Sequence, residues 1–299
     1  MKIRFWGVRG SIASPGRDTA EFGGNTSCYE VESAGGTRVI LDAGTGMRPL
    51  GNLLLPLMPL DLHVFVSHTH WDHIQGFPFF SPAFVRGNNL HMYGPALHER
   101  TLEGAMRTQM DYTFFPVRES ELRASLTYRN LKEETLTLGD LTVRCKYTNH
   151  PVLTLSFRIE DAKHSLVYSG DMEPYYNILQ DPRAPLDPEE LEEIEAEVRF
   201  QNARHVAFCQ GADVLIHDAQ YTRAEYESQR RGWGHCAMED AIDIGLRAGV
   251  KRLVLSHHDP TSTDPFLAAA EKRFQDQVAG TGMKLCFARE GLVIMPGED

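Results

Sequence analysis

The feature that most constrains this chain is a run of metal-binding residue types, His68-Thr69-His70-Trp71-Asp72-His73, which directly follows the apolar segment Val64-Phe65-Val66. Imidazole and carboxylate groups are ligands that zinc and similar divalent metals prefer in proteins. A strand that leads through a tight loop into the start of a helix would point all four side chains into one pocket, and the helix dipole would favour Asp72 there. The motif therefore predicts a metal site between a strand and a helix.

A second set of candidate ligands is spread along the rest of the chain. Each member directly follows an apolar segment that reads as a strand: His150, Asp171 and His257. Strand ends are where α/β-type sheets carry their site residues. Taken singly, each of the three could be an ordinary turn or helix-cap residue. Because one motif cannot fill two coordination spheres, the three residues in combination with the first motif predict a two-metal site.

Periodicity and turn residues predict a chain that interleaves strands and helices. The predicted strands are Lys2–Trp6, Cys28–Glu32, Arg38–Leu41, Leu62–Ser67, Leu141–Tyr147, Leu153–Glu160, Ser165–Ser169, Val214–His217, Arg252–Ser256, Leu285–Arg289 and Leu292–Met295. The predicted helices are Met47–Leu57, Leu97–Met110, Pro188–Phe208, Met238–Ala248 and Pro265–Val278. Two sheets packed face to face, with helices on both outer sides, would satisfy this pattern. No linker is visible, so we predict a single domain over residues 1–299.

Charge and cysteine usage narrow the class of protein. The chain has 30 Lys and Arg against 41 Asp and Glu, a net charge of −11, which disfavours binding of long nucleic acids. Its five cysteines are widely spaced and form no CxxC pair, so neither a disulfide framework nor a thiolate zinc site is expected. No signal-peptide pattern or membrane-length apolar stretch is visible. We therefore expect a cytoplasmic protein with no membrane partner.

The order HxHxDH, then His, then Gly-Asp, then His resembles the metallo-β-lactamase superfamily along nearly the whole chain. The segments Phe5–Ser11 and Asp42–Gly46 fit the same resemblance. The resemblance implies an α+β fold, an αββα four-layer sandwich of two mixed sheets with the metal site at one edge. It implies that His68, His70 and His150 hold a first metal, that Asp72, His73 and His257 hold a second, and that Asp171 bridges them. Asp42 would orient a ligand imidazole.

Two later segments, His217-Asp218-Ala219 and Trp233-Gly234-His235-Cys236, resemble the phosphodiesterase branch that includes tRNase Z. By that resemblance His235 contacts the scissile phosphate and Asp218 orients it, so the implied catalytic residues are Asp72, His235 and Asp218. Cys236 stands where the branch usually has Ser or Thr, and cysteine caps a following helix poorly. The basic arm of tRNase Z has no counterpart in the 20 residues between His150 and Asp171. A small phosphodiester is therefore favoured over tRNA.

The segments Trp6–Ser11, Gly23–Ser27 and Ser256–Pro260 also resemble bacterial proteins described as cyclic-nucleotide phosphodiesterase-like. The combined hypothesis is a two-metal hydrolase that cleaves a small phosphodiester, such as a cyclic nucleotide, with a metal-bound hydroxide. The alternatives are a carboxyl-ester or lactone hydrolase, a ribonuclease of the same fold, and a non-catalytic metal-dependent sensor.

Several choices stay open at this point. Two divalent ions are implied, and zinc suits the imidazole-rich donors best, with Mn²⁺ and Fe²⁺ as alternatives. His257 is preferred to His258 as the last ligand by alignment with the branch. A homodimer is one expectation, because relatives are often dimers. The phenylalanines near the first motif are expected to pack in the core rather than line the cleft: Phe77, Phe79, Phe80, Phe114 and Phe115.

Overall fold

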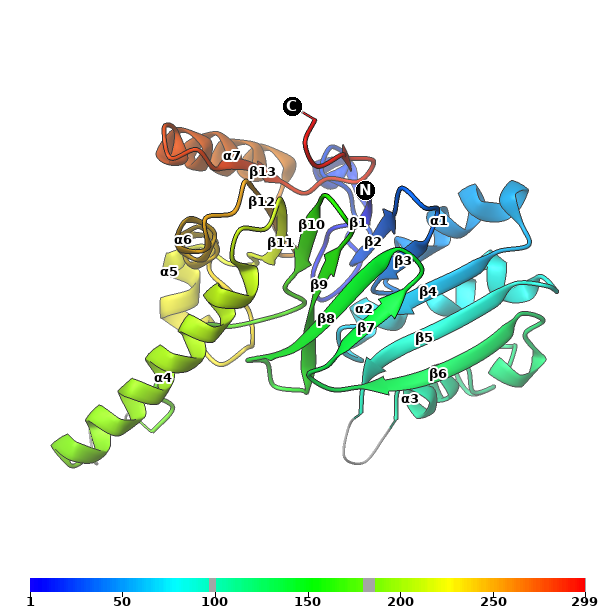
Figure 1. Cartoon of the computed structure of the whole chain (residues 1–299), viewed down its shortest axis with the longest axis horizontal. Coiled ribbons are helices and arrows are strands. Elements are labelled where there is room, and N and C mark those ends of the chain that lie inside the picture. The colour runs from blue at the N-terminus through cyan, green and yellow to red at the C-terminus, as the bar shows by residue number, and fades with distance from the viewer. Residues whose placement is uncertain (97–100, 180–185, 299) are drawn as a thin grey trace.

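A computed structural model describes residues 1–96, 101–179 and 186–298. Two seven-stranded sheets form its centre, with helices on their outer sides (Figure 1). The first sheet has the order β14 (Val293–Ile294), β1 (Lys2–Gly7), β2 (Cys28–Glu32), β3 (Arg38–Leu41), β4 (Asp61–Phe65), β5 (Asn89–Pro95), β6 (Ser125–Leu131). The second has the order β13 (Lys284–Phe287), β12 (Arg252–Ser256), β11 (Val214–Asp218), β10 (Ser165–Tyr168), β9 (Thr154–Glu160), β8 (Leu141–Thr148), β7 (Thr135–Leu138).

Both sheets are mixed. In the first sheet β14, β1, β2 and β3 pair antiparallel, and β3 to β6 pair parallel. In the second sheet β7 to β10 pair antiparallel, and β10 to β13 pair parallel. The carboxyl ends of neighbouring parallel strands lie at one edge of a sheet. In this fold, that edge receives the loops after β4 in one sheet and after β10, β11 and β12 in the other.

The helices fall into two groups. The first comprises α1 (Met47–Leu54), α2 (Trp71–Ile74) and α3 (Leu102–Gln109), and α1 and α3 contact strands of the first sheet. The second comprises α4 (Pro188–Cys209), α5 (Arg223–Glu225), α6 (Met238–Ala248) and α7 (Asp264–Val278), of which α6 and α7 contact the second sheet. Short 3-10 or π turns lie at Arg17–Thr19, Leu55–Leu57, Phe77–Phe79, Ser81–Phe84, Glu119–Glu121 and Tyr226–Arg230. Helix α4 packs on α6 and extends away from the sheets (Figure 1).

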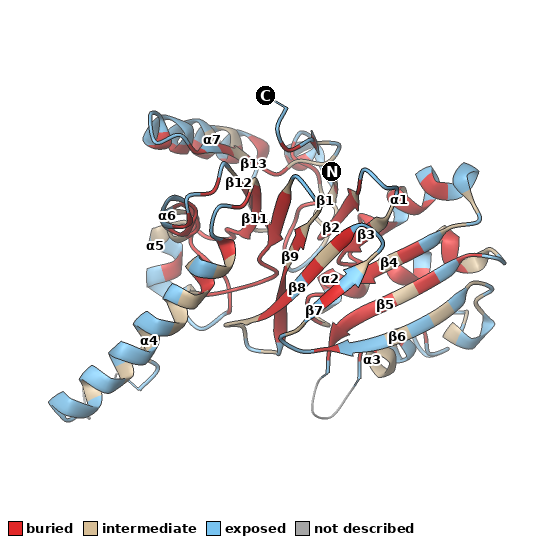
Figure 2. Ribbon diagram, viewed as in Figure 1, coloured by how far each residue is buried: buried red, intermediate tan, exposed pale blue. Residues whose placement is uncertain are grey.

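Side-chain alternation along the strands explains the four layers. In β3, Val39 and Leu41 face the core between the sheets, whereas Ile40 belongs to the apolar cluster beneath α1 and α3. In β10, Tyr168 faces the inter-sheet core and Val167 packs toward α6 and α7. Successive strand residues point to opposite faces, so strands that are apolar on both faces require cover on both. The burial pattern in Figure 2 follows this arrangement, and the expected αββα sandwich is confirmed.

Some elements differ from the sequence-based expectation. Strands β5, β6 and β7 were not predicted; β6 and β7 are sheet-edge strands with many exposed side chains, so they carry a weak apolar signal. The helix expected over Leu97–Met110 begins at Leu102, and its residues 97–100 lie outside the described residues. The helix expected over Met47–Leu57 becomes a 3-10 turn at Leu55–Leu57, which contains a proline. Within the described residues, no helix has the length and apolar character to span a bilayer.

Candidate metal centre

The first motif forms a strand–loop–helix corner. Strand β4 ends at Phe65, and α2 begins at Trp71 with His70 in extended conformation as its N-cap. His68, Asp72 and His73 are buried, while the side chain of Trp71 between them is 80% exposed. The short helix therefore turns Asp72 and His73 inward, as expected for the strand–loop–helix corner, and its tryptophan lies at the surface.

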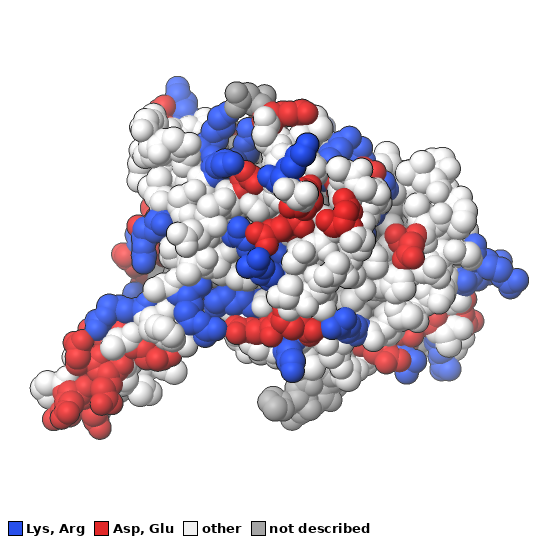
Figure 3. Space-filling model, in the orientation of Figure 1, with Lys and Arg blue, Asp and Glu red and all other residues white. Residues whose placement is uncertain are grey.

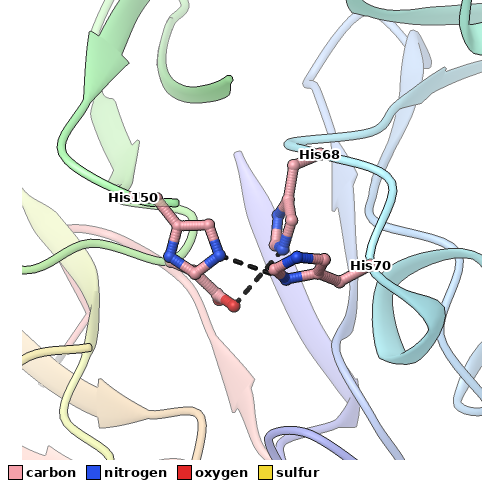
Figure 4. A group of neighbouring side chains, drawn as sticks. His68, His70 and His150 are labelled. Atoms are coloured by element: carbon pink, nitrogen blue, oxygen red, sulfur yellow. Dashed lines mark hydrogen bonds and ion pairs between the residues drawn. The ribbon is translucent and has the colours of Figure 1, made fainter. Parts of the chain in front are cut away.

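The second sheet brings the other candidates to the same place. His150 follows β8, Asp171 follows β10 through Gly170, and His257 follows β12. Figure 4 shows the imidazoles of His68, His70 and His150 turned toward one another across the junction of the two sheets. Nε2 of His150 lies 3.1 Å from Nδ1 of His70. Residues that are 80 positions apart in the sequence thus become neighbours because the strand ends of both sheets meet here.

All seven predicted ligand residues fall into two overlapping groups whose donor atoms lie within 4.8 Å of one another. One group is His68, His70, His150 and Asp171, and the other is Asp72, His73, Asp171 and His257. Asp171 belongs to both, which is the position a bridging carboxylate requires. A third overlapping group contains Asp171, Asp218, His235 and His257. The first two groups coincide with the two ligand sets that the family resemblance implied.

The second group is tightly interlocked. Nε2 of His73 lies 3.2 Å from Oδ2 of Asp171 and 3.3 Å from Oδ2 of Asp72. Nε2 of His257 lies 3.2 Å from Oδ2 of Asp72 and 3.2 Å from Oδ1 of Asp171. Two buried carboxylates and two imidazoles therefore point their donor atoms at one small volume.

A divalent metal fits this donor set. Nε2 of His68 and Oδ1 of Asp171 are buried and have no aligned hydrogen-bond partner among the described residues. Such unsatisfied buried atoms are uncommon in folded proteins and call for an explanation, for which an ion is one candidate. Nitrogen and carboxylate oxygen donors, with no thiolate among them, are a set that zinc accepts.

Burial and neighbouring charge act oppositely on the imidazoles. Burial lowers the pKa of His68 well below its ordinary value and the pKa of His150 to about 4, so both are neutral and able to coordinate at neutral pH. Burial also acts to lower the pKa of His73, but the carboxylates of Asp171 and Asp72 outweigh it and raise that pKa well above the ordinary value. The buried carboxylates thus stabilise positive charge in the site, and bound cations would neutralise them.

Asp42 contacts several residues beneath the first motif through its buried carboxylate. Its Oδ2 lies 2.8 Å from Nδ1 of His73, so the expected contact with a ligand-type imidazole is present. The same carboxylate accepts hydrogen bonds from Ser67 and from the hydroxyl of Tyr168. Tyr168 belongs to the second sheet, so this bond joins the two sheets directly under His73. Sequence reasoning missed Ser67 and Tyr168, because neither residue type suggests a metal site.

Three residues that are not glycine have left-handed backbone angles in the described part of the chain, and all three lie at this centre. They are Ser11 with φ 62°, Asp42 with φ 60° and His257 with φ 62°. The backbone N–H of Ser11 donates to Oδ2 of Asp72 at 2.7 Å. A Cβ added at Gly10 would lie 2.4 Å from the ring of His257, so the chain must approach this imidazole closely. Strained backbone at functional positions is a common association.

The two adjacent histidines at the end of β12 point in different directions. His257 faces Asp72 and Asp171, and its Nδ1 lies 3.2 Å from Oε1 of Gln220. His258 is buried on the other side, where its Nε2 donates to the carbonyl of Ala288 at 2.8 Å. The geometry accordingly brings His257, and not His258, to the cluster.

His235 and Asp218 meet beside the ligand groups. Nδ1 of His235 lies 2.9 Å from Oδ2 of Asp218, the contact that the resemblance implied. Cys236 does not cap α6: the N-cap is Ala237, and the Cys236 side chain is buried in the apolar cluster around α6. The residue at this position therefore contributes to core packing and not to the helix start.

A buried carboxylate that sequence reasoning overlooked holds the loop before His235. Glu173 accepts hydrogen bonds from the hydroxyl of Tyr226 at 2.7 Å and from the backbone N–H groups of Gly232 and Gly234 at 2.8 and 3.0 Å. The carbonyl of Gly234 in turn accepts from Nδ1 of His150 at 2.8 Å. Glu173 therefore links the backbone two residues after Asp171 to the loop that orients His150. Its position after Gly-Asp was the only available signal.

A cavity of about 410 Å³ opens onto the donors and is lined by Ser11, Thr69, His70, Trp71, Asp72, Asp171 and His235. It exposes a carboxylate–imidazole floor next to His235. Such a pocket can hold a small anionic group between bound cations and a side chain able to exchange a proton.

Residues 37–187, just over half of the chain, match the family described as Beta-lactamase superfamily domain. Ribonuclease Z of Thermoplasma acidophilum is 26% identical over 305 residues that cover 92% of each chain. The metallo-beta-lactamase fold protein YhfI from Bacillus subtilis superimposes with a TM-score of 0.67 at 19% identity, covering 98% of this chain and 99% of that one. Zn²⁺-bound PqqB from Methylobacterium extorquens gives a TM-score of 0.63 at 13% identity, covering 99% and 100%.

Proposed function

The chain belongs to the β-lactamase superfamily, and from that membership we propose that it is a two-metal phosphodiesterase that cleaves a small phosphodiester. The observation that carries the proposal is that His235 lines the donor cavity and its Nδ1 lies 2.9 Å from Oδ2 of Asp218. An imidazole oriented by a carboxylate is the usual arrangement of a general acid or base. Such a group accelerates ester hydrolysis at phosphorus by protonating the leaving oxygen.

We propose that two divalent metals, most simply zinc, occupy the two donor groups. The first would be held by His68, His70, His150 and Asp171, and the second by Asp72, His73, His257 and Asp171. When bound, the metals would supply Lewis acidity to the phosphoryl group and to the attacking water. The nitrogen and oxygen donors support this choice of metal, and PqqB, a protein of the same fold, is known in a Zn²⁺-bound form.

The residues of the chain supply the remaining steps. Nδ1 of His235 bonds to Asp218, which leaves Nε2 as the atom that exchanges a proton with the substrate. Oδ1 of Asp218 also accepts from the backbone N–H of Gln220, which fixes the carboxylate. His235 would protonate the leaving oxygen, and Asp218 would stabilise the positively charged ring during the exchange. Asp72 would contribute to catalysis as a ligand of the second metal.

The proposed substrate is small because the surface does not favour a long phosphate backbone. The outer half of α4 carries six exposed glutamates and extends from the body: Glu189, Glu190, Glu192, Glu193, Glu195 and Glu197. Figure 3 shows these acidic side chains gathered over the outer end of the helix. Acidic surfaces repel nucleic-acid backbones. The relatives named ribonuclease Z keep RNA cleavage as the second candidate function.

The cellular setting is part of the same proposal. All five cysteines are free, and four of them are buried. Free thiols are typical of a reducing compartment, which supports a cytoplasmic location.

The test is hydrolysis of bis-p-nitrophenyl phosphate, a panel of cyclic nucleotides and a short single-stranded RNA by the zinc-loaded protein. We expect turnover of the small diesters, and a fall in kcat of about 10²-fold or more for His235→Ala, as for loss of a general acid. His164→Ala is the matched control, because His164 directly precedes β10, whereas Asp171 and the donor cavity lie beyond the other end of that strand. Absence of diester turnover with both metals bound would overturn the proposal, and turnover of RNA alone would favour the second candidate.

A further inference from the structure

A second cavity lies next to the donor cavity, on the outer side of α2. Its volume is about 510 Å³, and its lining comes from α2, the 3-10 turn Phe77–Phe79, α3 and the segment after α3. Thr69 and Trp71 line both cavities. Since Trp71 stands between His70 and Asp72 in the sequence, its exposed indole forms part of the wall where the two cavities meet.

The two cavities differ in chemistry. The donor cavity is lined by imidazoles and carboxylates, whereas the second is lined by aromatic, aliphatic and uncharged polar side chains. The aromatic members are Trp71, Phe79, Phe114 and Phe115, and the rings of Phe79 and Phe115 meet edge to face at 5.3 Å. Two of these phenylalanines are unexpectedly exposed: Phe79 by 56% and Phe114 by 71%. The expectation that they pack in the core is wrong for both, although it is right for Phe77 and Phe80.

Amide groups accompany the rings. Gln75 on the α2 side and Gln109 at the end of α3 both line the cavity, together with the hydroxyl-bearing Thr108. Glutamine amides can donate to and accept from the edge of a base, and aromatic rings stack on its faces. Within the protein, the amide nitrogen of Gln75 donates to Oγ1 of Thr26 and that of Gln109 to Sδ of Met106, both at 3.3 Å. Their amide oxygens are left as acceptors for the amino group of a base. An alkyl chain has no such donor, so a planar group with polar edges fits the lining better.

We propose that this second cavity binds the nucleobase of the substrate while the phosphodiester lies over the metal-ligand residues. This inference rests on the proposed phosphodiesterase function and deepens it by assigning a nucleotide as the substrate class. The cavity is of the size range common for small-molecule sites, about 300–1,000 Å³. A nucleotide whose phosphate faces Asp72 would extend its base across Trp71 into the aromatic cavity. Selectivity for substrates that carry a base would then come from the side of the cleft formed by the helices and turns that cover the first sheet.

Adenosine tests the subsite separately from catalysis, because it carries a base but no phosphate. We expect adenosine to quench tryptophan fluorescence, and Trp71→Phe to remove most of that signal. Phe114→Ala should weaken adenosine binding about five- to tenfold, in the range for loss of one stacking partner. Phe200→Ala is the matched control, because Phe200 is 57% exposed but lies on α4, away from the cavity. No quenching, or equal binding of cyclohexanol, would overturn the inference.

Turnover then separates this inference from the proposed function. For adenosine 3′,5′-cyclic phosphate, Phe114→Ala should lower kcat/KM about five- to tenfold, and for the base-free ribose 3′,5′-cyclic phosphate it should leave kcat/KM unchanged. If both diesters were cleaved equally well by every variant, the subsite would be refuted and the phosphodiesterase would stand. If adenosine bound as expected while no diester was cleaved, the proposed function would fail and the base-binding cavity would stand as a site of another activity.

Discussion

The two sheets contribute to the metal centre in different ways. The first sheet supplies its donors from one corner, in which His68, His70, Asp72 and His73 lie within six consecutive residues. The second sheet supplies His150, Asp171 and His257 from the ends of three different strands. The first set depends on one local turn, whereas the second set depends on the alignment of β8, β10 and β12. Loss of a support in the second sheet should therefore disturb one donor at a time.

The largest effect is expected at Asp171, the residue that the two donor groups share. Asp171 belongs to both donor groups, so Asp171→Asn should lower metal content at both positions. The loss of metal catalysis, worth several kcal/mol, corresponds to a fall in kcat/KM of about 10³-fold. His68→Ala, which belongs to one group only, should keep more bound metal. The measurements are metal content after dialysis and diester turnover.

Asp213→Asn is the control for that experiment, because Asp213 precedes β11 at the end of the sheet opposite to Asp218. It should keep both metals and most of the activity. Equal metal loss in His68→Ala and Asp171→Asn would contradict the prediction that Asp171 serves both donor groups. The donors from the two sheets would then contribute to metal binding in the same way.

An intermediate effect is expected at Glu173. The amide of Glu173→Gln keeps the shape of the carboxylate, but it removes the negative charge and turns an N–H group toward at least one of the donors from Tyr226, Gly232 and Gly234. Groups that orient a metal ligand typically change metal affinity or activity about 10- to 100-fold. We expect that loss in kcat, with weaker metal binding at the group that contains His150.

Glu160→Gln, on β9 of the same sheet, should have no such effect. Titration of the apo-protein with zinc gives the two affinities, and a thermal melt reports any general loss of stability. If Glu173→Gln lowered the melting temperature but left both zinc affinities and kcat unchanged, its role would be structural only.

The smallest effect on activity is expected at the bond between the sheets. Tyr168→Phe removes a buried hydrogen bond to the carboxylate of Asp42. Bonds to charged groups contribute about 1.5–3 kcal/mol, so the free energy of unfolding should fall by that amount in urea titrations. Because Asp42 keeps its bonds to His73 and Ser67, kcat/KM should fall less than tenfold. If kcat/KM fell more than tenfold while the free energy of unfolding fell by no more than about 3 kcal/mol, the alignment of the two sheets at the site would depend chiefly on this tyrosine.

The sequence predicted the architecture and the candidate ligand residues better than the residues that hold those ligands in place. Contiguous His68–His73 could be recognised directly, because the motif and the strand before it are local. His150, Asp171 and His257 were found through their position after apolar strands and through the family resemblance. Their roles as ligands, like the single-domain organisation, stay predictions.

What escaped the sequence depends on contacts between distant segments. Tyr168 reaches Asp42 across 126 positions, and Glu173 reaches Gly234 across 61. Neither contact leaves a periodic or compositional trace. The exposed phenylalanines were misjudged for a related reason: an aromatic residue in sequence predicts burial, and only the fold shows which face is left uncovered.

The three left-handed residues have a consequence for any attempt to make this protein more heat-resistant. Glycine at the exposed position 11 would relieve about 1 kcal/mol or more of backbone strain without removing a buried side chain. Glycine at Asp42 or His257 would also remove the buried hydrogen bonds of those side chains, and at Asp42 that loss exceeds the strain relieved. A library screened for folding alone would therefore favour glycine at position 11, where a more mobile backbone holds the N–H donor to Asp72 less firmly. Screens that score heat resistance should score catalysis in the same round, because here the two properties compete at one residue.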